Sequence, residues 1–170
     1  GVDDLVLLTL GTGIGGGIII GGRILHGQIG MAGELGHITI SPNGNPCGCG
    51  NRGCVEKHAS ATAVSAMARL LGLGPALTAQ QVHDLAAQGN DRAKEIFGVM
   101  GEALGIALAS LINIFNFPLY LLGGGVVGAW EFFSPAMLAE VERRCFTYRR
   151  PRKMWPARYE PARLGAERWR

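Results

Sequence analysis

The run Gly33–Glu56 carries one histidine and three cysteines in a stretch that is rich in glycine and other turn residues. One nitrogen and three sulfurs form the Cys₃His set that zinc accepts in closed tetrahedral sites. Such a site contributes roughly 10 kcal/mol or more of folding free energy in small zinc domains, and this loop has little apolar content of its own. The alternative is a set of reduced or disulfide-bonded thiols. We therefore predict a structural zinc site with the ligands His37, Cys47, Cys49 and Cys54.

Two acids flank the predicted ligands. Glu34 lies three residues before the histidine, and Glu56 lies two residues after the last cysteine. The order Glu-x-Gly-His followed by Cys-x-Cys-Gly-x-x-Gly-Cys-x-Glu resembles the ROK family of bacterial sugar kinases and sugar-responsive repressors. The resemblance implies that Glu34, His37 and Glu56 bind sugar hydroxyls, while the histidine and the cysteines hold zinc. Carboxylates suit this task because each accepts charge-assisted hydrogen bonds. The alternative for either glutamate alone is a solvated surface acid.

Upstream of the metal loop, the glycine-rich run Leu8–Gly17 contains G-x-G-x-x-G. A dinucleotide fingerprint would open a helix, whereas these glycines lead into Ile18–Ile20 and then a second turn, so we predict a strand hairpin. Backbone N–H groups in such a hairpin can cradle phosphate, and Thr12 adds a hydroxyl donor. The resemblance implies that Thr12 and Gly13 bind the phosphates of ATP. A glycine-rich hairpin without a ligand is the alternative.

A second glycine cluster, Gly123, Gly124 and Gly125, follows the apolar run Pro118–Leu122, which we predict to be a buried strand. Ligands of α/β sheets gather at the carboxyl ends of strands. The resemblance implies that these three glycines approach the adenosine of ATP, and a tight turn is the alternative.

Between these motifs the sequence predicts three helices. One runs from Glu56 to Leu71, with Ala59, Ala63, Met67 and Leu70 repeating at helical spacing along an apolar stripe. Another opens at Thr78 with a capping box completed by Gln81, and the third covers about Asp91 to Ile114. His83, on the second helix, is expected at the surface.

Composition fits a single domain: 170 residues, 48% apolar, with no segment that reads as a signal or membrane span. Three cysteines assigned to a metal indicate a reducing compartment, so we expect a cytoplasmic protein. Cys145 is left over and is expected to be inert. The resemblance implies an α/β fold equivalent to the C-terminal lobe of an actin-like ATPase (ribonuclease H-like), and a homodimer.

The last 28 residues, Arg143–Arg170, hold ten of the 16 Lys and Arg but only two of the 13 Asp and Glu, which gives a net charge of +8 against −5 for the rest. A basic run can attract nucleic acid, but a solvated and incomplete end is the expectation here. In the resembled family a last helix opens with Leu-Gly, and only five residues follow Leu164-Gly165.

Function follows from the resemblance. It implies ATP-dependent phosphorylation of a hexose, with glucose as the expected substrate and its 6-hydroxyl as the acceptor, and with Mg²⁺ on the phosphates. Family kinases also have an N-terminal lobe with an Asp-x-Gly-Gly-Thr loop and an Asn-Asp segment whose aspartate is the base. We expect both upstream of Gly1 and expect the 170-residue chain alone to be inactive. A sugar-sensing repressor and a zinc-stapled interaction module are the alternatives; fructose, mannose and N-acetylated amino sugars are the other substrates considered.

Overall fold

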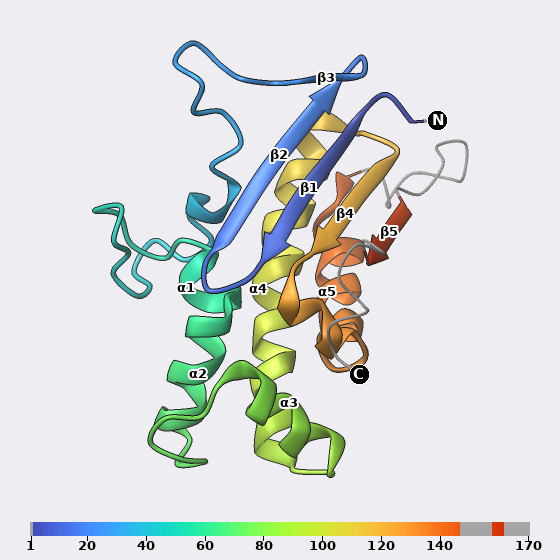
Figure 1. The fold of residues 1–170 in the computed structure, drawn as a ribbon. Coiled ribbons are helices and arrows are strands. Elements are labelled where there is room, and N and C mark those ends of the chain that lie inside the picture. The colour runs from blue at the N-terminus through green and yellow to red at the C-terminus, as the bar shows by residue number, and fades with distance from the viewer. Residues whose placement is uncertain (1, 147–157, 162–170) are drawn as a thin grey trace.

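The computed structural model of the chain describes residues 2–146 and the backbone of residues 158–161 (Figure 1). The remainder of the basic segment, with Leu164-Gly165, lies outside the described residues. Three strands come first along the chain, helices separate them from a fourth strand, and further helices separate the fourth strand from the fifth. The strands are β1 (Leu5–Leu10), β2 (Ile14–Ile20), β3 (Arg23–Ile24), β4 (Leu119–Gly123) and β5 (Arg158–Pro161). The helices are η1 (Leu35–His37), α1 (Glu56–Ala59), α2 (Ala61–Leu70), α3 (Ala79–Ala87), α4 (Asp91–Phe115), η2 (Gly125–Ala129) and α5 (Trp130–Arg144).

The strands form one mixed sheet in the order β3-β2-β1-β4-β5. The glycine-rich run makes the predicted antiparallel hairpin, with Thr9 opposite Gly15. β4 pairs in parallel with β1, so that Leu5 lies opposite Leu119, and β5 pairs in parallel with β4. The predicted α/β class and the buried strand after Pro118 are confirmed. The parallel pairing places the ends of β1 and β4 at the same edge of the sheet.

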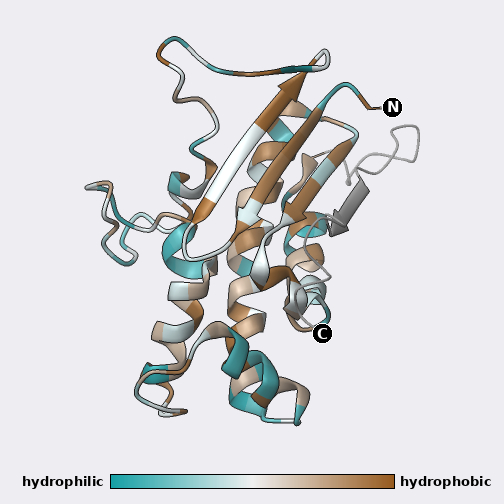
Figure 2. Cartoon of the chain, in the orientation of Figure 1, coloured by the Kyte–Doolittle hydropathy of each residue, from teal (hydrophilic) through white to brown (hydrophobic). Residues whose placement is uncertain are grey.

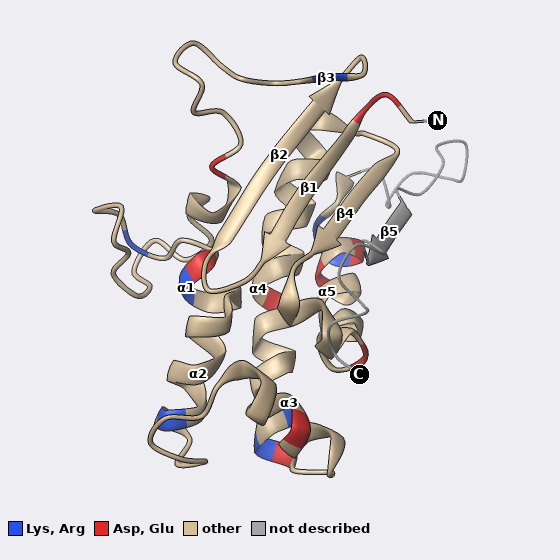
Figure 3. Ribbon diagram, viewed as in Figure 1, with Lys and Arg blue, Asp and Glu red and all other residues tan. Residues whose placement is uncertain are grey.

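In the view of Figure 1, α4 and α5 lie behind the sheet, and α2 and α3 lie below it. The core fills the space between the sheet and the helices. Val6, Leu8 and Leu10 alternate along β1 and are at most 1% exposed, as are Tyr120 and Leu122 on β4. In Figure 2 the hydrophobic colour covers most of β1 and the two ends of β2, while the glycines in the middle of β2 are nearly white. None of β1, β2 and β4 carries a charged residue (Figure 3). The alternation of buried residues along β1 and β4 has a period of two, which is typical of strands that place one face on a core.

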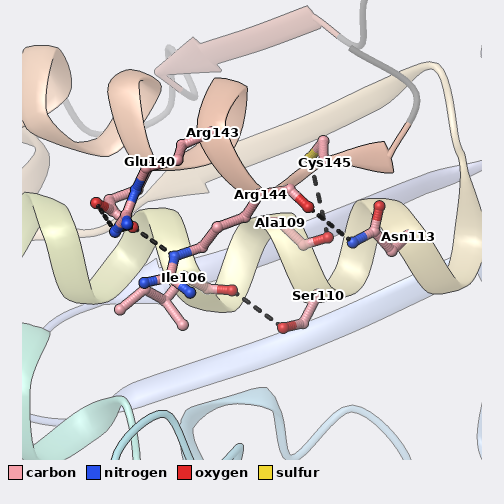
Figure 4. Close-up of polar contacts among 8 residues, drawn as sticks. All are labelled: Ile106, Ala109, Ser110, Asn113, Glu140, Arg143, Arg144 and Cys145. Atoms are coloured by element: carbon pink, nitrogen blue, oxygen red, sulfur yellow. Dashed lines mark hydrogen bonds and ion pairs between the residues drawn. The ribbon is translucent and has the colours of Figure 1, made fainter. Parts of the chain in front are cut away.

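The central helix α4 packs along α5, and polar contacts tie the two together where α5 ends (Figure 4). Asn113 donates through Nδ2 to the carbonyl oxygen of Arg144 at 3.3 Å. The thiol of Cys145 lies 3.9 Å from the carbonyl oxygen of Ala109. On the other side, Glu140 accepts hydrogen bonds from the last two arginines of α5. The contacts of Asn113 and Cys145 fix the end of α5 against α4, whereas those of Glu140 lie within α5.

The single helix predicted from Glu56 to Leu71 is wrong. The chain leaves the helical conformation at Ser60, where φ is −91° and ψ is 167°, and α2 starts anew at Ala61. The Ser60 hydroxyl accepts a hydrogen bond from the backbone N–H of Ala63 at 3.1 Å. Serine is a preferred N-cap residue, and this cap outweighs the helical spacing of the apolar residues on either side. Leu70, expected on the apolar stripe, is 80% exposed.

The other two predicted helices are present. The capping box of α3 is confirmed, because the Thr78 side chain accepts from the Gln81 backbone N–H and the Gln81 side chain accepts from that of Thr78. By length and composition α4 is apolar enough to cross a membrane, which the sequence interpretation did not anticipate. However, 67% of its apolar window is buried inside this fold, as in the core helix of a globular protein.

Candidate functional site

The four predicted metal ligands come together in the loop that precedes α1. Their ligand atoms all lie within 4.8 Å of one another. His37 Nδ1 is 3.6 Å from the Cys47 sulfur, and the sulfurs of Cys49 and Cys54 are 3.7 Å apart. A tetrahedral zinc ion with bonds of about 2.3 Å to sulfur and about 2.0 Å to nitrogen requires separations of this size. The donor set therefore fits the ion in number, chemistry and spacing.

The cysteines are free thiols. Their surroundings shift the pKa values of Cys47 and Cys54 in opposite directions. A hydrogen bond from the backbone of Cys49 lowers the pKa of Cys47 to about 7. Burial, together with the neighbouring sulfurs, raises the pKa of Cys54 to about 12. Several thiolates this close together need a cation between them, and a divalent metal ion supplies it.

Two of the loop glycines take backbone conformations that other residues avoid. Gly50 has a φ of +92° and Gly53 a φ of +67°, and a side chain on Gly53 would overlap the backbone of Ser41. The loop is further closed by a backbone hydrogen bond from Cys47 to Asn51 at 2.8 Å. The sulfurs of the cysteine motif converge because the chain can turn this tightly.

His37 connects this cluster to Glu34. While Nδ1 faces Cys47, Nε2 lies 3.9 Å from the Glu34 carboxylate. The Glu34 side chain is 63% exposed and that of His37 is 34% exposed. The imidazole thus has one nitrogen on the sulfur side and one on an open, acidic side.

Glu56, the first residue of α1, reaches the β1–β2 hairpin. Its Oε2 accepts a hydrogen bond from the backbone N–H of Ile14 at 3.0 Å. Gly13 makes room for this carboxylate, because a side chain there would overlap it. On the other side of Ile14, Gly36 lies so close that a Cβ would overlap the Ile14 carbonyl oxygen. The backbone of Ile14 therefore brings the segment of Glu34 and His37 next to Glu56, which follows it by about twenty residues.

The turn of the hairpin rests on the start of α2. The backbone N–H of Ala61 donates to the carbonyl oxygen of Gly11 at 2.8 Å, and the Thr62 hydroxyl donates to that of Thr12 at 2.7 Å. Thr12 itself is exposed. The turn is therefore held at the amino end of a ten-residue helix, where the helix dipole favours negative charge.

Two hollows flank this turn, and Gly11 lines both. The first, of about 330 Å³, is mostly apolar and includes Thr12 and Gly125. The second, of about 410 Å³, is shallower and includes Gly13, Gly124 and Glu56. The third glycine of the cluster, Gly123, is buried in β4 and lines neither. Four of the five residues assigned to the nucleotide thus lie around the hairpin turn.

Sequence reasoning missed the contribution of α3 to the first hollow. Gln80 and His83 line it together with Phe97 of α4. His83, expected at the surface, has only 26% of its side chain exposed, and its ring lies edge-on to Phe132 at 5.7 Å. The capping box located the start of α3, but no sequence signal shows that this start packs beside the hairpin.

An Asn-Asp pair does occur in this chain, at Asn90–Asp91, contrary to the expectation that it would lie only upstream. The Asn90 side chain caps α4 by accepting from the backbone N–H of Ala93 at 3.0 Å. The Asp91 side chain is 99% exposed and lies 4.0 Å from Lys94. Asp91 is the first residue of α4 and lines neither hollow.

The sequence of this chain is similar to those of known sugar kinases. A family model described as the ROK family matches residues 1–167. The glucokinase of Thermotoga maritima is 41% identical over 149 residues, which cover 79% of this chain and 47% of that protein. An N-acetylmannosamine kinase of Yersinia pestis is 35% identical over 167 residues, which cover 98% of this chain and 57% of that protein. The chain spans about half the length of the curated relatives it matches.

Two solved structures also superpose closely on the chain. A ROK family glucokinase from Streptomyces griseus, in complex with glucose and AMPPNP, superposes with a TM-score of 0.84 at 33% identity, covering 98% of this chain and 58% of that one. A ROK family transcriptional regulator, a homolog of the E. coli MLC protein, superposes with a TM-score of 0.77 at 34% identity, covering 86% and 40%.

Proposed function

The chain belongs to the ROK family, and on that premise we propose that it is the C-terminal lobe of an actin-like sugar kinase that phosphorylates a hexose with ATP. Relatives named glucokinase support the reaction class and favour glucose as the substrate. Because another relative is named N-acetylmannosamine kinase, other hexoses remain candidate substrates.

One observation carries this proposal: the hairpin turn stands between an apolar hollow and a carboxylate. Gly11 lines both hollows, Thr12 lines the first and Gly13 the second. Glu56 is hydrogen-bonded to the next residue, Ile14. A nucleotide whose base occupies the first hollow would extend its phosphates along this turn. Exposed Thr12 and the amino end of α2 provide donors and positive potential for them. The terminal phosphate would then point toward the side of Glu56, where a sugar hydroxyl can attack it.

The sugar side of the site has three side chains with an atom that can form a hydrogen bond to a sugar hydroxyl. They are Glu34, His37 and Glu56. Glu56 uses Oε2 for Ile14, and its Oε1 has no hydrogen bond to the described residues. The Glu34 carboxylate is largely exposed. Ionised carboxylates accept from two neighbouring hydroxyls at once and bind them more strongly than neutral groups do.

Zinc, bound by His37, Cys47, Cys49 and Cys54, would have a structural part in this scheme. It would supply the positive charge that holds the thiolates together and stabilises the loop. His37 would ligate through Nδ1, the nitrogen that faces Cys47, and Nε2 would remain for a sugar hydroxyl. The imidazole would thereby be fixed in one tautomer and one orientation.

The base that takes the proton of the attacking hydroxyl is not among these residues in the proposed mechanism. We place it, with the first phosphate loop, in the part of the relatives' length that this chain does not match. Mg²⁺ bound to ATP would neutralise the phosphates, as phosphoryl transfer generally requires. The 170-residue chain alone should therefore bind zinc but not turn over substrate. A cytoplasmic homodimer completes the proposal, without a role in binding membranes or nucleic acid.

A sugar-sensing repressor is the second candidate, because the structure of a ROK transcriptional regulator resembles the chain nearly as well. Both candidates use the sugar side of the site, whereas only the kinase needs the hairpin and the apolar hollow to bind ATP.

The deciding experiment measures phosphate transfer by the complete protein with ATP, Mg²⁺ and glucose, mannose or N-acetylmannosamine. Sugar-dependent ADP formation supports the kinase. Sugar binding without ADP formation, with DNA binding released by sugar, would establish the repressor. The isolated 170-residue chain serves as the control and should show zinc but no turnover.

A further inference from the structure

The apolar hollow has one polar edge, and α3 provides it. Its walls are apolar side chains and bare backbone, and its volume of about 330 Å³ is that of a small-molecule site. Within this lining the side chains that can form hydrogen bonds with a ligand are those of Gln80 and His83 on α3 and Thr12 on the hairpin. Thr12 lies at the turn, so the α3 pair is what a flat base in the hollow would meet at its edge.

Three side chains of α3 hold one another in place. Asp84 Oδ1 lies 2.8 Å from Gln80 Nε2 and 3.2 Å from His83 Nδ1. Hydrogen bonds from Gln80 and His83 lower the pKa of Asp84, so the carboxylate is ionised and acts only as an acceptor. The two nitrogens are 3.4 Å from each other, as expected for two donors that share one acceptor oxygen.

This arrangement fixes the proton on His83. Nδ1 lies nearer to the Asp84 carboxylate, at 3.2 Å, than to the amide nitrogen of Gln80, at 3.4 Å. Because the carboxylate can only accept, we assign the hydrogen to Nδ1, and in the neutral ring Nε2 is then an acceptor. Nε2 makes no hydrogen bond to the described residues. The ring is further held edge-on to Phe132. His83, held in this way, is therefore a pre-oriented residue in the lining of an apolar pocket.

We propose that Nε2 of His83 selects the nucleobase by accepting a hydrogen bond from an exocyclic amine, so that the site takes a 6-amino purine in preference to a 6-oxo purine. Asp84 is a positioning residue that acts through His83, and Gln80, which lines the same hollow, donates a hydrogen bond to Asp84. The inference rests on the proposed function, since it assigns the base-recognition residue of the same nucleotide site. A 6-oxo purine would place its carbonyl oxygen against the lone pair of Nε2, and two facing acceptors repel each other.

The test compares ATP with ITP, whose base carries a carbonyl in place of the 6-amine, as phosphate donors for the complete protein. We expect ATP to be preferred in kcat/KM, and His83→Phe, which keeps an aromatic ring beside Phe132, to reduce that preference about tenfold. The loss should appear in the KM for ATP, while kcat and the KM for sugar stay close to their original values. His83→Gln, which supplies an amide oxygen as acceptor, should restore part of the preference. Asp84→Asn should weaken it less than His83→Phe does.

Gln88→Leu, at the end of α3 and away from the hollow, is the matched control and should leave the ratio unchanged. Circular dichroism verifies that each variant is folded. If His83→Phe does not fold, His83→Gln and Asp84→Asn still test the inference. Phosphorylation with ATP and an unchanged ATP to ITP ratio in folded His83→Phe overturns this inference alone. A complete protein that uses neither nucleotide overturns the proposed function, and this inference with it.

Discussion

The carboxylate of Glu56 accepts a hydrogen bond from the backbone N–H of Ile14 at 3.0 Å, across 42 positions of sequence. Gly36 lies against the carbonyl side of the same residue. One peptide of the hairpin thus sets the relative position of the segment with Glu34 and of the helix with Glu56.

Replacing Gly36 by alanine should disturb this junction. The added Cβ would overlap the Ile14 carbonyl oxygen, and the neighbouring atoms are backbone, so the segment must move. We expect a loss of about 1–3 kcal/mol in the free energy of unfolding, measured by urea denaturation, and weaker sugar binding. Gly98→Ala in α4 is the matched control, because a Cβ there meets open space. It should stabilise the helix by about 0.5–1 kcal/mol. Equal effects of the two substitutions would contradict the close packing at Gly36.

Glu34→Ala should abolish sugar binding by the complete protein without releasing zinc, because the carboxylate faces Nε2 of His37 and not the sulfurs. Calorimetric titration with sugar and metal analysis of the same sample check both halves of this statement. Glu95→Ala, which removes an exposed acid on α4, should alter neither quantity. Normal sugar affinity in Glu34→Ala would show that the ligand assignment is wrong.

Cys49→Ser should release the metal and lower the thermal unfolding temperature, because the hydroxyl is a poor substitute for a thiolate ligand. The measurement is zinc per chain after dialysis, together with the melting curve. Cys145→Ser is the comparison: it removes a thiol as well, in this case a buried one that lies against Ala109 and outside the cluster. It should destabilise the fold and retain its zinc, so a loss of zinc there would argue against the proposed ligand set.

Alkaline pH should weaken the fold through Cys145. Burial raises the pKa of this thiol from 9.0 to about 11, so the folded state favours the neutral form. The resulting stability is complete below pH 9 and is lost as the pH rises from 9 to 11, by up to about 2 kcal/mol. Urea denaturation at pH 8 and pH 10.5 measures the loss. Cys145→Ala should show a smaller decrease over the same interval; an equal decrease would assign it to other groups.

Much of the candidate site could be predicted because its chemistry is local in sequence. The spacing of the cysteines alone predicted a cluster whose atoms the structure brings within 4.8 Å. Thr78 and Gln81 likewise predicted their own capping box. The break at Ser60 carried a signal too, a serine between alanines, but the apolar spacing around it favoured a continuous helix.

Other features depend on packing between distant segments and leave no trace in local patterns. His83 reads as a polar residue on an amphipathic helix, and only the docking of α3 beside η2 and the hairpin turns it toward a hollow. Asp91 follows an asparagine, as a catalytic aspartate does in the family, yet it lies at an exposed helix start. Sequence supplies the residue types in these cases, and tertiary structure decides what they face.

The parallel pairing of β1 with β4 also governs when this sheet can be assembled. Leu5 meets Leu119 only after the whole helical segment between them has been synthesised. Such long-range contacts are slow to form because a large loop must close first. The β1–β2 hairpin needs only its neighbours, so it can form early while the other edge of β1 still lacks a partner. During that interval a nascent chain exposes an apolar strand edge, which is the kind of surface that chaperones bind and that aggregates share.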